Sequence, residues 1–325
     1  MKLNYGCAIR EALNKELKSE LPTVFFGQDI HYNIYGYTEN LVNEFGEERV
    51  INTPISENSV VGMAIGAAIC GVRTIVDLTV ANFLYMAMDQ IVNMASKNAY
   101  MYNGAFNLPI TIMCGEFYNV GNAAQHSDRL HSLFINFPGL KIVAPASAQD
   151  AYSLLRSAIN DNNPVLYFSD RSLFYTENDV DLNMKIDIGR ASIIEKHENS
   201  TITVVAISGC VQLVIDLISD LKKMNINIDL IDLRSIVPLD IDLIFDSVKR
   251  TGRIVIVDTS NRSGSIASHI SSIVSENLFS FLKAPIAIVA FDDVPVPFAN
   301  NLEKILMPTK EKIYNKVIQI HNYTM

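Results

Sequence analysis

The first half of the chain alternates short apolar runs with longer stretches in which apolar residues recur every three or four positions. Each short run ends at a polar or glycine-containing loop, as a buried strand does. The longest amphipathic stretch, residues 82–101, predicts a helix with one apolar stripe. The short runs are residues 23–26, 74–80, 108–113 and 141–145. This alternation predicts a parallel sheet with helices on both faces, an α/β fold.

A polar stretch at residues 176–184 separates this half from a second series of the same kind. Its expected strands are residues 202–207, 226–233, 253–258 and 286–290, and its expected helices are residues 209–224, 240–248 and 265–282. We therefore expect two doubly wound α/β domains, over residues 1–176 and 185–325.

Composition narrows the possible functions. The chain has 325 residues, which is longer than a domain with a single hydrophobic core usually is. Its net charge is -9, with acidic and basic residues interspersed. We therefore do not expect the protein to bind nucleic acid. The four cysteines lie far apart in the sequence and predict neither a zinc site nor a disulfide framework. No targeting segment or membrane-spanning run is evident, so we expect a cytoplasmic protein.

One stretch, residues 53–68, combines an acidic residue with closely spaced small residues. Ser56 is expected to cap a helix, and Glu57 then lies in its first turn, where the helix dipole favours a negative charge. Gly62 and Gly66 weaken a helix unless something packs closely against it. An ordinary capped helix explains the pattern equally well when the stretch is considered alone.

The order of motifs resembles a known family. Glu57 to Ala67 is similar to the pyrimidine-binding signature of thiamine diphosphate enzymes. Residues 53–57, 124–127 and 137–141 resemble, more narrowly, the beta subunit of thiamine diphosphate-dependent 2-oxo acid dehydrogenases of the pyruvate, acetoin or branched-chain type, which belong to the transketolase-like superfamily. The resemblance extends from about Leu3 to Lys316. It implies a pyrimidine-binding domain followed by a transketolase C-terminal-like domain.

The resemblance also implies a cofactor site. A carboxyl group on the pyrimidine ring lets the cofactor remove its own thiazolium proton, and Glu57 is the residue that we expect to supply it. The family pattern places Ile55, Thr79 and Phe83 around the same ring, with Phe83 as the stacking aromatic. Core filling is an equally good explanation for Ile55 and Thr79.

His126 lies in a small, polar segment, and an imidazole can exchange protons near neutral pH. The resemblance implies a role at the entrance to the active site, in substrate orientation and acyl transfer. Outside this context a loop histidine is usually solvated or capping. The remaining histidines are expected to be structural: His31, His131, His197, His269 and His321.

The resemblance further implies a potassium site. Its ligands would be Ile110, Ala158, Ile159, Asp161 and Asn163. A plain helix C-terminus followed by an Asp/Asn turn before Pro164 is the alternative.

The chain lacks the Gly-Asp-Gly segment with which thiamine enzymes hold magnesium and diphosphate. The resemblance therefore implies an alpha subunit that supplies Mg²⁺ and the diphosphate site, in an α2β2 heterotetramer. The chain departs from the family pattern at Gln28, Asp77, Ser169 and residues 113–117, which leaves the substrate open.

Three functions are compatible with these residues. The first is the beta subunit of an enzyme that decarboxylates a 2-oxo acid and passes the acyl group to lipoamide on an acyltransferase component, or to another acceptor. The second is half of a split transketolase that transfers ketol units between sugar phosphates, which predicts basic residues for phosphate in the pocket. The third is a non-catalytic assembly subunit, which Glu57 and His126 argue against.

Overall fold

The computed structural model describes residues 1–117 and 120–324 and divides into two compact units. The N-terminal unit consists of residues 1–117 and 134–188, and the C-terminal unit consists of residues 120–133 and 189–324. The C-terminal unit thus includes a segment from the first half of the sequence, whereas the predicted domains are continuous. Met325, the last residue of the predicted second domain, lies outside the described residues.

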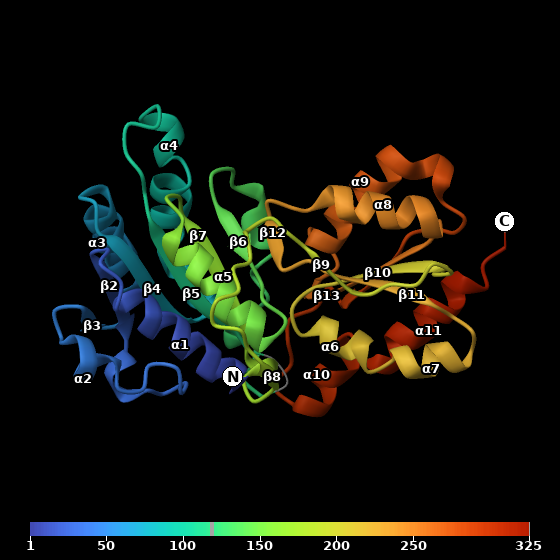
Figure 1. Ribbon diagram of the computed structural model, residues 1–325, viewed down its shortest axis with the longest axis horizontal. Coiled ribbons are helices and arrows are strands. Elements are labelled where there is room, and N and C mark those ends of the chain that lie inside the picture. Colours follow the sequence, from blue (N-terminus) through green and yellow to red (C-terminus); the bar gives the residue numbers. More distant parts are fainter. Residues whose placement is uncertain (118–119, 325) are drawn as a thin grey trace. The chain divides into compact units, whose positions relative to one another are not determined.

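A parallel sheet forms the centre of the N-terminal unit (Figure 1). Neighbouring strands pair in parallel, and their residues are mostly buried because helices cover both faces. In spatial order the strands are β6 (Lys141–Val143), β7 (Val165–Asp170), β5 (Ile110–Glu116), β4 (Arg73–Val80), β2 (Thr23–Gln28) and β3 (Val50–Thr53). A short antiparallel pair joins β1 (Lys2–Asn4) to β8 (Glu177–Asp179).

Helices α1 (Tyr5–Leu17) and α5 (Ala148–Asn160) pack against each other and share one apolar core with the sheet. Each begins at a side-chain cap, from Asn4 and Ser147, that accepts a hydrogen bond from a free N–H of the first turn. Helix α3 (Glu57–Ile69) packs against β4. Shorter elements complete the unit: η1 (Ile30–Tyr32), α2 (Leu41–Phe45), η5 (Leu133–Asn136), whose first residue belongs to the C-terminal unit, and η6 (Arg171–Leu173).

The predicted continuous helix over residues 82–101 is wrong. The segment forms a 3₁₀ helix, η2 (Ala81–Ala87), then a π-helix, η3 (Asp89–Ala95), and then a short α-helix, α4 (Asn98–Met101). The Ser96 N–H donates to the carbonyl of Ile91 at 2.9 Å, five residues back, as in a π turn. Of the five residues in the predicted apolar stripe, Ala87, Ile91 and Ala95 are buried, whereas Phe83 is half-buried and Met94 is 40% exposed.

The C-terminal unit has a second sheet, in which β9 alone among the described strands pairs in antiparallel fashion. In spatial order the strands are β14 (Ala287–Phe291), β13 (Ile254–Asn261), β10 (Ile202–Ala206), β11 (Ile228–Asp232) and β9 (Ser192–Glu195). Helices α8 (Ile241–Thr251) and α9 (Ile266–Leu278) lie on one side, and α6 (Cys210–Ile215), α7 (Ile218–Lys223) and α11 (Lys310–His321) on the other (Figure 1). The remaining elements are η4 (Ala124–His126), β12 (Ser235–Val237), η7 (Phe279–Phe281) and α10 (Asn300–Leu306). The predicted fold class, two doubly wound α/β domains, is confirmed.

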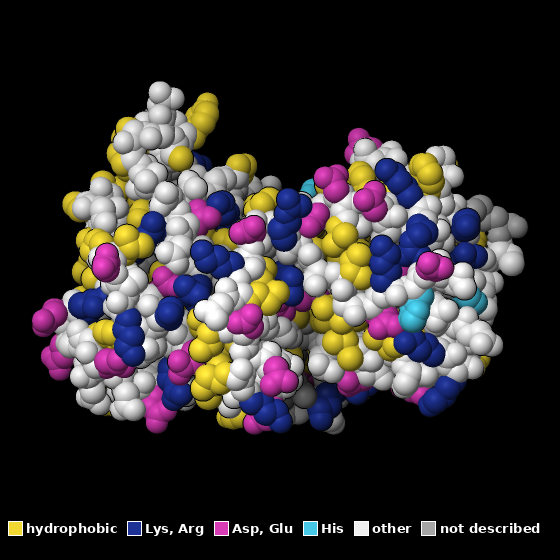
Figure 2. Space-filling view, viewed as in Figure 1, with side chains coloured by type: hydrophobic (Ala, Val, Ile, Leu, Met, Phe, Trp, Pro, Cys, Tyr) yellow, Lys and Arg dark blue, Asp and Glu magenta, His cyan; other side chains and the backbone are white. Residues whose placement is uncertain are grey.

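Among the described residues, no helix is long and apolar enough to cross a membrane. The four cysteines are free thiols; Cys114 and Cys210 are buried, Cys7 is half-buried and Cys70 is exposed. Acidic and basic side chains are mixed over the face shown in Figure 2, in keeping with the charge pattern of the sequence.

Candidate functional site

Glu57 is the first residue of α3 and follows the loop that leaves β3. Ser56 occupies the N-cap position, but its side chain makes no capping hydrogen bond, so the predicted cap is wrong in this respect. Its ψ of 65° differs from the extended backbone of Asn4 and Ser147, whose side chains do cap. The positive end of the α3 dipole is therefore left for the Glu57 carboxylate or for a ligand.

A small cavity lies beside Glu57, where the carboxyl ends of β2, β3 and β4 meet. Gln28 is opposite Thr53 in the parallel pairing of β2 with β3, and Gly27 is opposite Asp77 in the pairing with β4. The cavity measures about 10 Å³, which is space for roughly one water molecule. It is lined by Gln28, Thr53, Pro54, Ser56, Glu57, Val60, Asp77 and Leu78. Open parallel sheets bind ligands at this edge.

The Glu57 side chain is half-buried. Among the residues that the structure describes, none forms a hydrogen bond or an ion pair with its carboxylate. A carboxylate at a helix N-terminus with no partner of its own is available to a ligand that can share a proton with it.

Asp77 lines the same cavity, although the sequence indicates it only as a departure from the family pattern. Its carboxylate is buried and accepts two hydrogen bonds, from the Tyr37 hydroxyl at 2.7 Å and from the Thr79 N–H at 2.8 Å. Burial raises the pKa of Asp77 to about 6, and these two hydrogen bonds lower it only in part. An acid in an otherwise apolar strand was the signal for this site.

The other three residues predicted around the pyrimidine ring differ in their surroundings. Ile55 is 73% exposed, so core filling does not explain it. Phe83 is half-buried in η2. Thr79 is half-buried and has a φ of 59°, in the left-handed region. A β-branched residue in that region costs about 1–3 kcal/mol, and such strain is concentrated at functional sites.

The two glycines of α3 lie in different environments. A Cβ atom on Gly62 would lie 3.2 Å from Oε1 of Gln90 in η3, so this glycine permits a close approach between the two helices. A Cβ atom on Gly66 would meet nothing within 4 Å. The predicted close packing is therefore found at Gly62 and not at Gly66 within the described chain.

His126 belongs to the C-terminal unit, where it ends the short helix η4 and is half-buried. The residue before η4, Ala123, has a φ of 59° and a ψ of -178°, a conformation usually restricted to glycine. Glu57 belongs to the N-terminal unit. The approach of His126 to Glu57 therefore stays a prediction.

A buried ion pair holds the segment that carries His126 to the rest of the C-terminal unit. Arg129 Nη2 lies 3.2 Å from Oε1 of Glu303 in α10, and both side chains are almost fully buried. The Arg129 guanidinium also lies over the Phe291 ring, 4.6 Å from its centroid. Loss of one partner would leave a buried charge, so this pair fixes the segment firmly.

A second buried cluster holds the same segment. His131 Nε2 lies 2.9 Å from Oδ1 of Asp258 and 2.7 Å from Oγ of Ser260, and Ser132 Oγ lies 2.9 Å from Oγ of Ser260. Burial favours a raised pKa for Asp258, but His131 and the hydrogen bonds from Ser260 outweigh it and hold that pKa below its usual value. His131 thus has the structural role that the sequence predicts for it.

Arg73 binds two of the five predicted potassium ligands, Ile159 and Asp161, at the end of α5. Arg73 Nη1 donates to the carbonyl oxygens of Ile159 and Asp161, at 3.0 and 2.9 Å, and Arg73 Nη2 donates to Oδ1 of Asn162 at 2.9 Å. Lys141 forms an ion pair with the Asp161 carboxylate. A guanidinium thus already binds two of the predicted ligand oxygens, and the potassium site stays a prediction.

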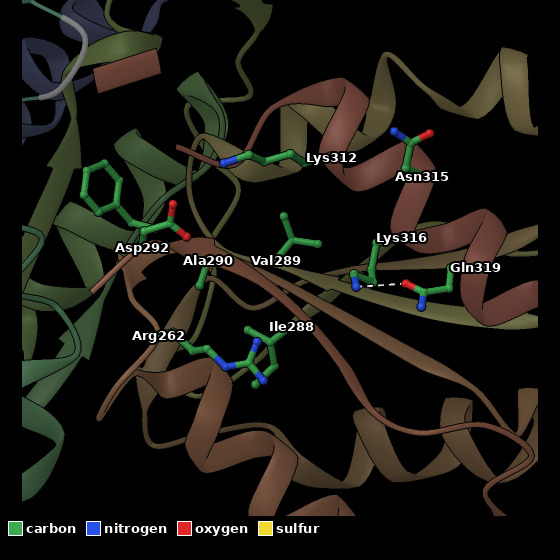
Figure 3. A pocket seen from close by; sticks show the side chains of 10 residues that line it. Arg262, Ile288, Val289, Ala290, Asp292, Lys312, Asn315, Lys316 and Gln319 are labelled. Atoms are coloured by element: carbon green, nitrogen blue, oxygen red, sulfur yellow. Dashed lines mark hydrogen bonds between the residues drawn. The ribbon is translucent and has the colours of Figure 1, made fainter. Parts of the chain in front are cut away.

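A further cavity, of about 380 Å³, lies in the C-terminal unit between β14 and α11 (Figure 3). Its walls carry Arg262, Lys312 and Lys316, and the ammonium groups of both lysines already donate to oxygens of the protein, those of Ile305 and Gln319. None of the residues predicted from sequence lines it. Among the described residues there is also no group of three or more His, Cys, Asp or Glu side chains that could hold a metal ion.

Comparison with known proteins gives a match over most of the chain. Residues 1–176 match the family described as transketolase, pyrimidine binding domain, and residues 189–313 match transketolase, C-terminal domain. A solved structure described as a split-gene transketolase, inactive beta4 tetramer, superposes with a TM-score of 0.79 over 99% of this chain and 97% of that one. Its sequence identity of 19% supports a likeness in fold alone.

Two curated relatives are similar over nearly their whole length. The pyruvate dehydrogenase E1 component subunit beta of Rickettsia bellii is 38% identical, over 98% of this chain and 99% of that protein. The acetoin:2,6-dichlorophenolindophenol oxidoreductase subunit beta of Bacillus subtilis is 34% identical, over 96% of this chain and 95% of that protein.

The fold and the family matches define a thiamine diphosphate-dependent protein of the transketolase superfamily. Within that class, the chain belongs to the family of beta subunits of 2-oxo acid dehydrogenases. The resemblance described from the sequence is thereby confirmed.

Proposed function

We propose that this chain, together with an alpha subunit, decarboxylates a 2-oxo acid and transfers the acyl group to an acceptor, and that Glu57 is the residue that activates the cofactor. The observation that carries the proposal is the position of Glu57. Its carboxylate lies at the start of α3, beside the edge where β2, β3 and β4 end, and has no partner among the described residues.

Thiamine diphosphate, when bound, supplies a nucleophilic carbon and an electron sink for decarboxylation. The residues present fit its aminopyrimidine part. Glu57 would hold a proton at the ring nitrogen, and the exposed Ile55 and the half-buried Phe83 would provide apolar contacts to the ring. The helix dipole at the start of α3 keeps a negative charge on Glu57 favourable while no ring is bound.

The size of the cavity supports a site shared with another chain. Space for about one water molecule does not admit a pyrimidine ring, so the N-terminal unit by itself offers one wall of a site. Exposed apolar side chains on α3 and η2, those of Met63, Tyr85 and Met86, lie in the same part of the unit. Apolar side chains are visible over the region of α3 and α4 in Figure 2. Exposed apolar groups of this kind mark protein contacts.

For His126 we propose a role in proton transfer to and from the bound substrate. The two buried clusters that fix its segment, at Arg129 and at His131, would keep the imidazole in place. Mg²⁺ and the diphosphate would be held by the alpha subunit in an α2β2 assembly. A lipoyl-bearing acyltransferase component is the proposed acyl acceptor. Potassium is left out of this mechanism because Arg73 already donates to two of its five predicted ligands, Ile159 and Asp161.

The test is the substitution Glu57→Gln in the complex with the alpha subunit. The amide cannot give up a proton as an acid does, so we expect turnover of a 2-oxo acid to fall by roughly 10²–10⁴-fold. The assay follows reduction of an artificial electron acceptor with pyruvate or another 2-oxo acid as donor. Glu47→Gln, at an exposed residue outside the site, is the matched control. Unchanged turnover in Glu57→Gln would contradict the proposal, and activity with sugar phosphates alone would favour a split transketolase.

A further inference from the structure

The pairing of β4 with β5 contains an irregularity at its carboxyl end. Asp77 is opposite Met113 and Val80 is opposite Gly115, so the three-residue step on β4 faces a two-residue step on β5. One additional residue is therefore accommodated in β4, as in a β-bulge. Thr79 lies within this step and has the left-handed φ of 59°. Bulges next to active sites redirect the side chains and the chain that follow.

The surroundings of Thr79 explain how a threonine holds this conformation. Its N–H donates to Asp77 Oδ1 at 2.8 Å, two residues back along the chain. The other carboxylate oxygen, Oδ2, accepts from the buried Tyr37 hydroxyl at 2.7 Å, which fixes the carboxylate from the opposite side. A Cβ atom on Gly115 would lie 3.1 Å from the Thr79 carbonyl oxygen, so the glycine leaves room for the bulge.

We propose that Asp77 is a positioning residue, which holds the Thr79 bulge so that Thr79 and the following turn with Phe83 face the aminopyrimidine of thiamine diphosphate beside Glu57. The proposal rests on the proposed function, because it assumes that the cofactor binds at this edge. Asp77 touches neither cofactor nor substrate in this scheme. Its effect on binding passes through the backbone of Thr79 and through the start of η2 at Ala81.

The physical reason is the cost of a left-handed β-branched residue. Without an acceptor for its N–H, Thr79 would relax toward an extended backbone, and the step between Asp77 and Val80 would shift in register. A one-residue shift turns the following side chains to the other face of the strand, Val80 among them. Glycine adopts a left-handed conformation without this cost, so Thr79→Gly should remove the need for the Asp77 contact.

The experiment is a double-mutant cycle in the complex with the alpha subunit. The dissociation constant of thiamine diphosphate, with Mg²⁺ present, is measured calorimetrically for wild type, Asp77→Ala, Thr79→Gly and the double variant. We expect Asp77→Ala to weaken binding about tenfold or more when Thr79 is present, and less than about twofold when it is combined with Thr79→Gly. Asp246→Ala, at an exposed helix position in the C-terminal unit, is the control.

Two more measurements make the result decisive. Hydrogen exchange of the segment 78–83 without cofactor should be faster in Asp77→Ala than in wild type, because the acceptor of the Thr79 amide is lost. Asp77→Asn retains an oxygen acceptor and should bind the cofactor within about threefold of wild type. This variant keeps the proposal testable if Asp77→Ala does not fold.

An equal loss from Asp77→Ala in both backgrounds, or no loss at all, would overturn the proposal. Failure of the wild-type complex to bind thiamine diphosphate would instead overturn the proposed function, while the exchange result would still report on the bulge.

Discussion

At the scale of single residues, the two carboxylates of the candidate site differ in environment. Glu57 is half-buried at a helix start and open to a ligand, whereas Asp77 is buried and already holds two hydrogen bonds. Separate environments allow neighbouring acids to take separate roles. Glu57 is suited to exchange a proton with a bound ring, and Asp77 is suited to hold the backbone that surrounds it.

The buried state of Asp77 predicts a specific pH dependence of stability. Its pKa is about 6 in the folded chain against an ordinary value of 3.8. Between these two values the unfolded chain has lost its proton and the folded chain keeps it, so the free energy of unfolding falls as the pH rises from about 4 to 6. Above pH 6 the ionised, buried carboxylate costs on the order of 3 kcal/mol.

We therefore expect Asp77→Asn to match wild-type stability near pH 4 and to exceed it by up to about 3 kcal/mol above pH 6. Chemical denaturation at a series of pH values, with wild type and variant compared at each, is the measurement. The difference isolates Asp77 from the other titrating groups. A difference that does not change with pH would show that Asp77 titrates in the same range in the folded and unfolded chains.

At the scale of elements, the strands were more predictable than the helices. Strands β4, β5 and β13 match their predicted positions to within a few residues, because short apolar runs in a parallel sheet are buried on both faces. The predicted helix over residues 209–224 is interrupted between α6 and α7, although its apolar pattern continues. Periodicity identifies a buried face, but it does not distinguish one continuous helix from several turns of different pitch.

The candidate site shows the same limit. Glu57 is predicted from its motif, whereas the proposed role of Asp77 depends on Tyr37, which is 40 residues away in sequence. The assignment of residues 120–133 to the C-terminal unit likewise depends on the contacts of Arg129 and His131 with residues more than 100 positions later. Pairings over such sequence separations leave no local pattern in a single sequence.

The contact between β4 and the end of α5 gives a prediction about cations. Arg73, the first residue of β4, donates to the carbonyl oxygens of Ile159 and Asp161 and to the side chain of Asn162. Arg73→Ala should lower the free energy of unfolding by about 1–3 kcal/mol, because these acceptors lose a charged donor. Arg73→Lys should retain part of this contribution, since an ammonium group cannot span all three oxygens.

Wild type and Arg73→Ala also test the potassium site. We expect no difference between KCl and NaCl, at equal ionic strength, in the thermal unfolding midpoint of the wild type, because the guanidinium already binds two of the predicted ligand oxygens. In Arg73→Ala, potassium should stabilise the chain more than sodium does, since the vacated oxygens can then bind a cation. A potassium-specific rise in the wild type would show that the ion and Arg73 bind side by side.

At the scale of the whole molecule, the chain offers one part of a cofactor site and an exposed apolar surface near it. Met63 and Met86 are 49% and 65% exposed, and they lie on α3 and η2, which pack against each other. The net charge of -9 favours solubility. Exposed methionines do not add to solubility, so solubility does not explain their position on this face. A partner chain that covers them would also close the site around Glu57.

We expect the isolated chain to bind thiamine diphosphate weakly or not at all, and the equimolar mixture with the alpha subunit to bind it as a complex of two copies of each chain. Met86→Glu should weaken that complex about tenfold or more, because it places a charge in an apolar contact. Met224→Glu, at a 56% exposed methionine of the C-terminal unit, is the matched control and should leave assembly unchanged. Analytical ultracentrifugation measures the assembly, and calorimetry measures the cofactor. Equal weakening by both substitutions would point to a general loss of solubility, and no weakening by Met86→Glu would place the partner on another face.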